Sequence, residues 1–345
     1  MTYIDPNQEE QIDLAPSTPV DRQAAPDWVC QRYLWSRFHR LLGKAPARIQ
    51  WRIDAWGSLV DPFNWSPRPL VVPALVGAGI FRASIRRVDQ LGLQDDDTLT
   101  LNGFGLNTHG DVGDKTMCSP HGPLTISKRI PDFACDITGI EGISESKSAD
   151  RHFGSVQAFG ADFQRHKQTP IDAQGLAMAL AHPEVRIRNA GTSDSFRVHT
   201  WDGRVFLCNS GGSHHFSMAV YIAAQLNQAV PLRGPLEVVE VNEKTVEWLL
   251  SNFLLFAVPK QFNRPYPVAM LAGSGYLLDG LKHIGMADAR LLLIERASVD
   301  SNEMQLLLQL LGATDMAVWF RELLRVQDAN KTLLYDKFNG LERFG

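Results

Sequence analysis

Apolar residues recur at intervals of three and four in several separate stretches of the chain. This spacing places apolar side chains on one face of a helix, so it predicts amphipathic helices. In the first quarter of the chain, the pattern predicts helices over residues 28–42 and 75–91. In the second half, it predicts helices over residues 173–181, 213–226 and 243–256.

The last part of the chain is also predicted to be helical, from residue 287 to the end. Leucine-rich stripes cover residues 304–311 and 316–324. Asp300 and Glu303 have the three-residue spacing of a helix-capping box, which favours a helix that begins just before the first stripe.

Short alternating or continuous apolar runs predict strands between these helices. Asp202 and Gly203 separate two of the runs, and this dipeptide is typical of a type I′ hairpin turn. Residues 94–150 are rich in Gly, Asp, Pro, Ser and Thr, which predicts short strands and irregular loops there. The predicted strands cover residues 184–189, 195–201, 204–209 and 236–241.

Together the elements predict an α+β fold with a small mixed sheet domain. An irregular N-terminal region and a helical C-terminal region are expected to flank it. The boundaries follow the changes in pattern and composition. They give a flexible tail at 1–26, a loop-rich region at 27–149, the sheet domain at 150–260 and the helical region at 261–345.

The composition of the 345-residue chain is that of an ordinary globular protein, with 44% apolar and 21% charged residues. The net charge of −4 argues against charge-driven nucleic-acid binding by the whole molecule. No apolar run is long enough for a membrane span, and the acidic start lacks the order of a secretory signal, so we expect a cytoplasmic protein. The four cysteines are scattered, which predicts reduced thiols.

The most distinctive chemistry lies in residues 209–216, which read NSGGSHHF between a predicted strand and a predicted helix. Gly211 and Gly212 can adopt backbone angles closed to other residues and let a ligand approach the main chain. The first N–H groups of the following helix have no partner within the helix, and that end carries a partial positive charge. The junction is therefore predicted to hold an anion such as phosphate.

Side chains at the junction add further chemistry. Asn209, Ser210, Gly211, Gly212 and Arg204 are the predicted anion-binding residues, and Ser213, His214 and His215 are the candidate catalytic residues. A histidine near a helix N-terminus tends to stay neutral, and a neutral ring can move a proton near pH 7. The alternative is a purely structural turn, in which Ser210 or Ser213 caps the helix.

The order of elements over residues 171–250 resembles the ParB/sulfiredoxin fold. A short helix, a proline-led strand, a hairpin, a glycine motif opening a helix and an exit strand follow one another, and the core reads GGSHH. The resemblance implies binding of nucleotide phosphates, with a nucleoside triphosphate and magnesium as the implied ligand. The residues alone leave the cofactor unknown.

Two positions depart from the pattern of that superfamily. Ser213 stands where sulfiredoxins carry a cysteine, which removes sulfur chemistry. His215 stands where the superfamily carries an arginine, which removes a bidentate phosphate clamp. The arginines near enough in sequence to replace it are Arg186, Arg188, Arg197 and Arg204.

The leading hypothesis is a protein that binds a small phosphate ligand or nucleotide, with phosphoryl transfer or nucleotide hydrolysis as its extension. The first alternative is a non-catalytic module for DNA or a protein partner. Aromatic and basic residues alternate over residues 32–52, but the acidic net charge disfavours nucleic acid. The second alternative is a metal-dependent hydrolase whose ligands would be His109, Asp111, Asp114, Cys118 and His121. The oligomeric state is left open.

Overall fold

The computed structural model describes residues 74–337, with gaps at 78, 92, 96–97, 107–111, 190, 260–273, 299–304 and 306–312. In this part of the chain, two β-sheets and five α-helices form a mixed structure. The predicted α+β class is confirmed. The expectations for residues 1–26, 28–42 and 304–311 and for the capping box at Asp300 and Glu303 fall wholly or largely outside the described residues.

The first sheet has five strands in the order β4-β8-β6-β7-β5. β8 pairs antiparallel with β4 and parallel with β6, while β6 and β7 form an antiparallel hairpin and β5 runs parallel to β7. Two of its strands, β4 and β5, come from the region predicted to contain short strands and irregular loops, and β4 is longer than expected there. The strands are β4 (Thr125–Asp136), β5 (Gly142–Ile143), β6 (Ser195–His199), β7 (Val205–Cys208) and β8 (Pro231–Val241).

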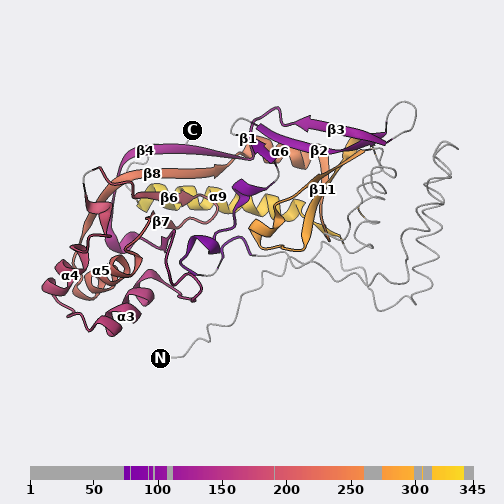
Figure 1. Ribbon diagram of the computed structural model, residues 1–345. Coiled ribbons are helices and arrows are strands. Elements are labelled where there is room, and N and C mark those ends of the chain that lie inside the picture. The colour runs from indigo at the N-terminus through magenta and orange to yellow at the C-terminus, as the bar shows by residue number, and fades with distance from the viewer. Residues whose placement is uncertain are drawn as a thin grey trace.

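Three helices gather at one end of this sheet (Figure 1): α3 (Val156–Lys167), α4 (Ala173–Leu180) and α5 (Ser213–Leu226). The side chains of Ser155 and Asp172 accept backbone N–H bonds and so fix where α3 and α4 begin. α3 and α5 approach closely at Gly160, where an added Cβ would lie 1.9 Å from the Ser217 carbonyl oxygen. The buried faces of the three helices form one apolar core with the sheet.

The second sheet contains the order β1-β2-β10-β11-β9-β12, with β3 paired to β2, and its pairings are antiparallel. β9 and β11 read as nearly continuous apolar runs, as expected for strands covered on both faces. The strands are β1 (Leu93–Asp95), β2 (Thr98–Leu106), β3 (Val112–Cys118), β9 (Phe253–Pro259), β10 (Ser274–Leu278), β11 (Ala289–Glu295) and β12 (Thr314–Asp315).

The two sheets are joined by helix α9 (Ala317–Lys337), which runs below β8 in Figure 1. The buried Gln327 of α9 accepts bonds from the Thr200 hydroxyl (2.6 Å) and the Val241 N–H (2.7 Å). Its amide nitrogen donates to the Val241 carbonyl at 3.0 Å. Removing such a side chain would leave buried polar groups unpaired, so this contact fixes α9 against the first sheet.

Several predicted elements are confirmed: the helices over 173–181 and 213–226, and the strands over 195–201, 204–209 and 236–241, within one to a few residues. The stripe over 316–324 lies in α9. The turn between β6 and β7 is not type I′, which needs two central residues with positive φ. Only Gly203 has one (φ 78°). The Asp202 carboxylate bonds to the Arg204 guanidinium in the same turn.

The predicted helix over 75–91 is wrong. This segment contains two short 3₁₀ turns, η1 (Arg82–Ser84) and η2 (Val88–Gln90), because Gly79 adopts φ +102° and Phe81 bridges to Ile143 beside β5. A right-handed helix cannot pass through a residue at that angle.

The helices predicted for the C-terminal part also need correction. The helix predicted over 243–256 ends at Asn252, and β9 follows as α6 (Glu243–Asn252) stops. Residues 289–295, predicted to be helical, form β11, and residues 184–189 form a 3₁₀ turn rather than a strand. Short apolar runs fit either structure, and here the pairing with β9 decides for strand.

Candidate functional site

The glycine junction has the geometry that its sequence predicts. α5 begins at Ser213, and Gly212 precedes it in the left-handed conformation with φ 74°. A Cβ on Gly212 would lie 2.4 Å from the Glu184 carbonyl oxygen, so this position requires glycine. However, the Gly212 N–H donates to a Glu184 carboxylate oxygen at 3.1 Å. The protein's own acid therefore takes up one of the backbone amides predicted to bind the anion.

The polar side chains of the turn bond to one another and to the loop after β5. The buried Ser213 hydroxyl donates to the Glu145 carbonyl, and the Asn209 side-chain amide donates to the Gly211 carbonyl and, at 3.0 Å, to Ser213 Oγ. The Asn209 N–H donates to Ser144 Oγ at 3.1 Å. The geometry of the turn is thus set by internal bonds, but neither Ser210 nor Ser213 caps α5 as the structural alternative expected.

His214 lies in the first turn of α5 and packs against α3. Its Nε2 lies 3.0 Å from Ser148 Oγ, and its ring lies 5.0 and 4.9 Å from those of Phe159 and Phe163. Burial is the main cause that lowers its pKa below the usual histidine value, and the nearby charge of Arg151 adds to it. The ring is therefore neutral near pH 7.

His215 stacks on His182, with ring centroids 3.6 Å apart and planes 8° from parallel. The edge of Phe163 lies against the same ring at 5.2 Å. Burial, followed by His182, lowers the pKa of His215. Both candidate catalytic histidines are thus members of an aromatic cluster between α3, α4 and α5.

The structure does not bring Arg204 to the junction. Arg204 precedes β7, whereas the junction follows β7. Its guanidinium donates to both carboxylate oxygens of the buried Asp202, at 2.6 and 2.7 Å, and to the Gly79 carbonyl at 2.6 Å. At the junction itself, the exposed Ser210 instead accepts a bond from Arg186. Arg204 acts as a structural arginine.

The candidate metal ligands are only partly within the described residues, which exclude His109 and Asp111. Asp114 and Cys118 lie on β3, and Cys118 is an exposed free thiol. Four residues of strand separate them by about 13 Å, too far to share one ion. Within the described ranges, no three His, Cys, Asp or Glu side chains gather as a metal would require.

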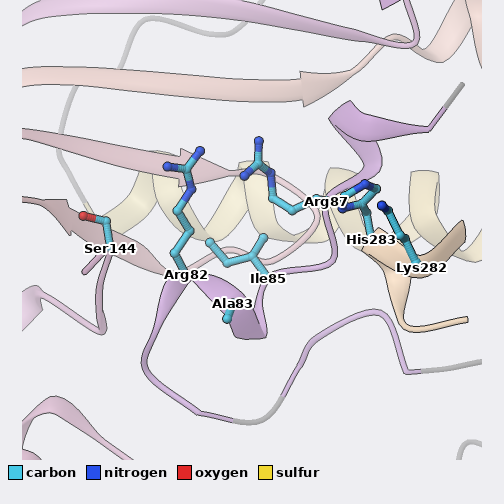
Figure 2. A pocket seen from close by; sticks show the side chains of 7 residues that line it. All are labelled: Arg82, Ala83, Ile85, Arg87, Ser144, Lys282 and His283. Atoms are coloured by element: carbon cyan, nitrogen blue, oxygen red, sulfur yellow. The ribbon is translucent and has the colours of Figure 1, made fainter. Parts of the chain in front are cut away.

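A second site, which no sequence motif predicted, is a pocket of about 380 Å³ where the two sheet units meet (Figure 2). Four of its seven lining side chains are cationic or can become so, and none is acidic. The lining residues are Arg82, Ala83, Ile85, Arg87, Ser144, Lys282 and His283.

Arg82 is the distinctive charge of this pocket. Its Nε is buried without a hydrogen-bond partner, and no carboxylate pairs with its guanidinium among the described residues. Burial, followed by the like charges of Arg87 and Arg197, lowers its pKa. The two neighbours are neutralised, Arg87 by Asp89 at 2.8 Å and Arg197 by Glu237 at 3.0 Å. Arg82 is left uncompensated.

The segment carrying Arg82 and Arg87 forms one side of the pocket, and each end of the segment is fixed by backbone contacts. At the first end, the Ile143 N–H donates to the Ile80 carbonyl at 2.8 Å, which places Ser144 beside Arg82. At the second end, the Arg87 N–H donates to the His283 carbonyl at 2.9 Å. Residues far apart in sequence are thereby held around one space.

Lys282 and His283 belong to a short 3₁₀ turn, η5 (Leu281–Ile284). Gly280 precedes it with φ 108°, and a Cβ there would lie 2.3 Å from the Gln90 carbonyl oxygen. This close approach presses η5 against the segment that carries Arg87. The Trp201 indole N–H adds a bond of 2.8 Å to the Arg86 carbonyl.

His199 is buried among the charges of the pocket wall. Its side chain is 0% exposed, and neither ring nitrogen has a hydrogen-bond partner. Burial lowers its pKa to about 3, with Asp89 acting in the opposite direction and Arg197, Arg87 and Arg82 adding to the lowering. The ring is neutral at physiological pH, so it adds no charge to the pocket.

One sequence signal could have pointed to the pocket: three arginines, Arg82, Arg86 and Arg87, within six residues. The predicted helix over 75–91 placed them on a solvated face. Lys282 and His283 carried no signal at all, because only the tertiary contact with residues 87–90 brings them close.

A model of a family of unknown function (DUF6685) matches residues 130–333. The match covers more than half of the chain. The chain belongs to this family. No curated protein and no solved structure matches it. The DUF6685 match contains the glycine junction, Ser144, Lys282 and His283, whereas Arg82 and Arg87 precede it. Of the helices in the described part of the chain, none combines the length and apolar character that crossing a membrane requires.

Proposed function

We propose that this protein binds a small phosphate-bearing ligand, such as a nucleotide, in the pocket beside Arg82. The observation that carries the proposal is the uncompensated Arg82 guanidinium, half-buried among two other arginines. Confining like charges raises the free energy of the empty pocket, and a bound anion would lower it. The proposed ligand class is the one predicted from the sequence. The proposed binding site is the pocket instead of the backbone amides of the junction.

The chemistry of the lining supports phosphate in particular. A guanidinium offers a planar set of donors that fits two phosphate oxygens at once. Lys282 adds a compact charge, and the His283 ring can donate one bond. The Ser144 hydroxyl also lines the space, but it already donates to the Asn209 carbonyl at 3.3 Å. The volume of about 380 Å³ lies within the range of small-ligand sites.

The resemblance to the ParB/sulfiredoxin fold supports the same ligand class and is part of this proposal. The order α4, β6–β7 hairpin, glycine turn, α5 and β8 resembles part of that succession, although a 3₁₀ turn replaces the proline-led strand between α4 and β6. Ser144 links the two regions, because its hydroxyl bonds to Asn209 of the turn while the residue also lines the pocket. Phosphoryl transfer or nucleotide hydrolysis is a further step, for which His283 is the titratable pocket ring that could move a proton.

Thermal unfolding of the full chain tests the proposal. The probes are inorganic phosphate, pyrophosphate and adenosine triphosphate, each with and without magnesium. We expect at least one probe to raise Tm, and Arg82→Ala to weaken its binding at least tenfold, the loss of one charged hydrogen-bonding group. Arg325→Ala is the matched control, because it removes an exposed arginine on α9 that pairs with Glu322.

Two results would count against binding in this pocket. If no probe shifts Tm at any concentration, the protein is better described by the alternative of a non-catalytic interaction module. If Arg82→Ala binds the probes as tightly as the unmodified chain and Arg325→Ala do, the ligand lies elsewhere.

A further inference from the structure

The pocket carries its uncompensated charge at two ends rather than at one point. Ser144 and Arg82 lie at one end, His283 and Lys282 lie at the other, and Arg87 lies between them (Figure 2). The backbone contacts agree with this order, because residue 80 bonds to residue 143 and residue 87 bonds to residue 283.

The middle of the pocket differs from both ends in charge. Asp89 accepts two bonds from Arg87 Nε, at 2.8 and 3.1 Å, and pairs with its terminal nitrogen. The hydrogen bond to Asp89 raises the pKa of Arg87. A carboxylate of the protein therefore already neutralises the charge of Arg87. The other side chains of the same segment that line the space, Ala83 and Ile85, are apolar.

Each end, in contrast, retains free donors. Arg82 has a guanidinium without a carboxylate partner, as described above. At the other end, the Lys282 side chain is exposed and has no partner among the described residues. His283 bonds to Gly280 and Arg87 through its backbone groups, not through its ring. A ligand with a single anionic group could neutralise only one of these ends.

We infer that the ligand carries two separated anionic groups, at least one of them a phosphate, joined by an uncharged spacer. This inference rests on the proposed function and narrows its ligand class to bisphosphates and phosphate–carboxylate compounds of small size. The Arg82 end holds one anionic group, and the Lys282–His283 end holds the other. The spacer lies over Ala83 and Ile85, beside the neutralised Arg87.

The experiment compares two sugar phosphates that differ in one group. Binding of fructose 1,6-bisphosphate and fructose 6-phosphate to the full chain is measured by calorimetry at fixed ionic strength. We expect the bisphosphate to bind at least tenfold more tightly than the monophosphate. Lys282→Ala should remove most of this difference while leaving monophosphate affinity within about twofold, because the single phosphate occupies the Arg82 end.

Two controls define the result. Lys244→Ala removes an exposed lysine from the first turn of α6, which is not among the pocket-lining residues, and should change neither affinity. Arg82→Ala should weaken both compounds. Since Lys282 is exposed, its replacement is not expected to affect folding.

A failure of the two-group ligand can be distinguished from a failure of the phosphate site at Arg82. Equal affinities, together with an unaltered Lys282→Ala variant, would overturn the two-ended ligand and leave a phosphate site at Arg82. Absence of binding by both sugar phosphates and by the probes named above would overturn both ideas.

Discussion

The glycine junction and the basic pocket both concentrate positive potential, but a carboxylate of the same chain bonds to the turn at the junction, whereas Arg82 in the pocket has none among the described residues. At the junction, the Gly212 N–H already bonds to Glu184. The buried side chains of Ser213 and Asn209 form hydrogen bonds within the protein. In the pocket, Arg82 has no carboxylate partner within the described ranges. A donor that is already satisfied gains little from a ligand, whereas an unsatisfied one gains a full interaction.

This difference shows what a phosphate-binding motif in a sequence leaves undetermined. Glycines before a helix supply donors and a partial charge, but a carboxylate of the same chain can use them as well as a ligand can. Glu184 lies far from Gly212 in sequence, and no motif would include it.

The largest effect is expected for Arg204→Ala compared with Arg82→Ala. Asp202, whose side chain is fully buried, loses its partner when Arg204 is removed, and breaking such a pair costs about 4 kcal/mol. Arg82→Ala removes an unmatched charge and should leave the unfolding free energy unchanged or raised. Urea unfolding measures both, and a similar loss in the two variants would contradict the distinction between structural and available arginines.

The next effect concerns the two glycines of the junction. Gly212→Ala should lower the unfolding free energy by about 3 kcal/mol, because it combines a left-handed backbone with a contact to the Glu184 carbonyl. Gly211→Ala is the matched control, since its nearest neighbour would lie 3.6 Å away and its φ is not positive. Chemical unfolding of both variants should separate them clearly, and equal stabilities would refute the described turn.

Acidification is expected to lower the unfolding free energy by an intermediate amount, because His199 is held neutral in the folded protein. Its pKa is about 3 in the folded protein and 6.5 when unfolded, so between these values the unfolded chain binds more protons. Stability is therefore fully present above pH 6.5 and falls by about 1.4 kcal/mol per pH unit towards pH 3. This amounts to about 2 kcal/mol at pH 5.

The matching measurement is the slope of unfolding free energy against pH in the unmodified chain and in His199→Phe. His214 and His215 also have lowered pKa values, so part of the slope should survive the substitution. An unchanged slope would mean that His199 is not held neutral in the pocket wall. Because the pocket cations contribute to this lowering, a bound anion should make the slope shallower.

The smallest effect is expected for Glu184→Gln. The glutamine oxygen can still accept from the Gly212 N–H, so only the charge at the beginning of α5 is lost, at about 0.5 kcal/mol. Glu247→Gln, an exposed position within α6, is the control and should be neutral. A thermal shift no larger for Glu184→Gln than for this control would show that Glu184 does not serve as the internal anion.

Local sequence patterns predicted much of the first sheet unit. The capped helix α4, the β6–β7 hairpin, the glycine turn and α5 were predicted because their periods, caps and glycines act within a few residues. The same patterns did not predict α3, nor the strand β11, whose apolar run fits either a helix or a strand until β9 pairs with it.

The α+β class, the turn at Gly212 and the beginning of α5 follow from local sequence, because backbone sterics and helix periodicity act between near neighbours. Which charges remain unmatched depends on the tertiary contacts. Glu184 reaches Gly212, Asp202 binds Arg204, and the turn at Lys282 and His283 packs beside Arg87 through contacts between distant segments. Electrostatic compensation depends on distance in space, and spacing along the chain does not encode it.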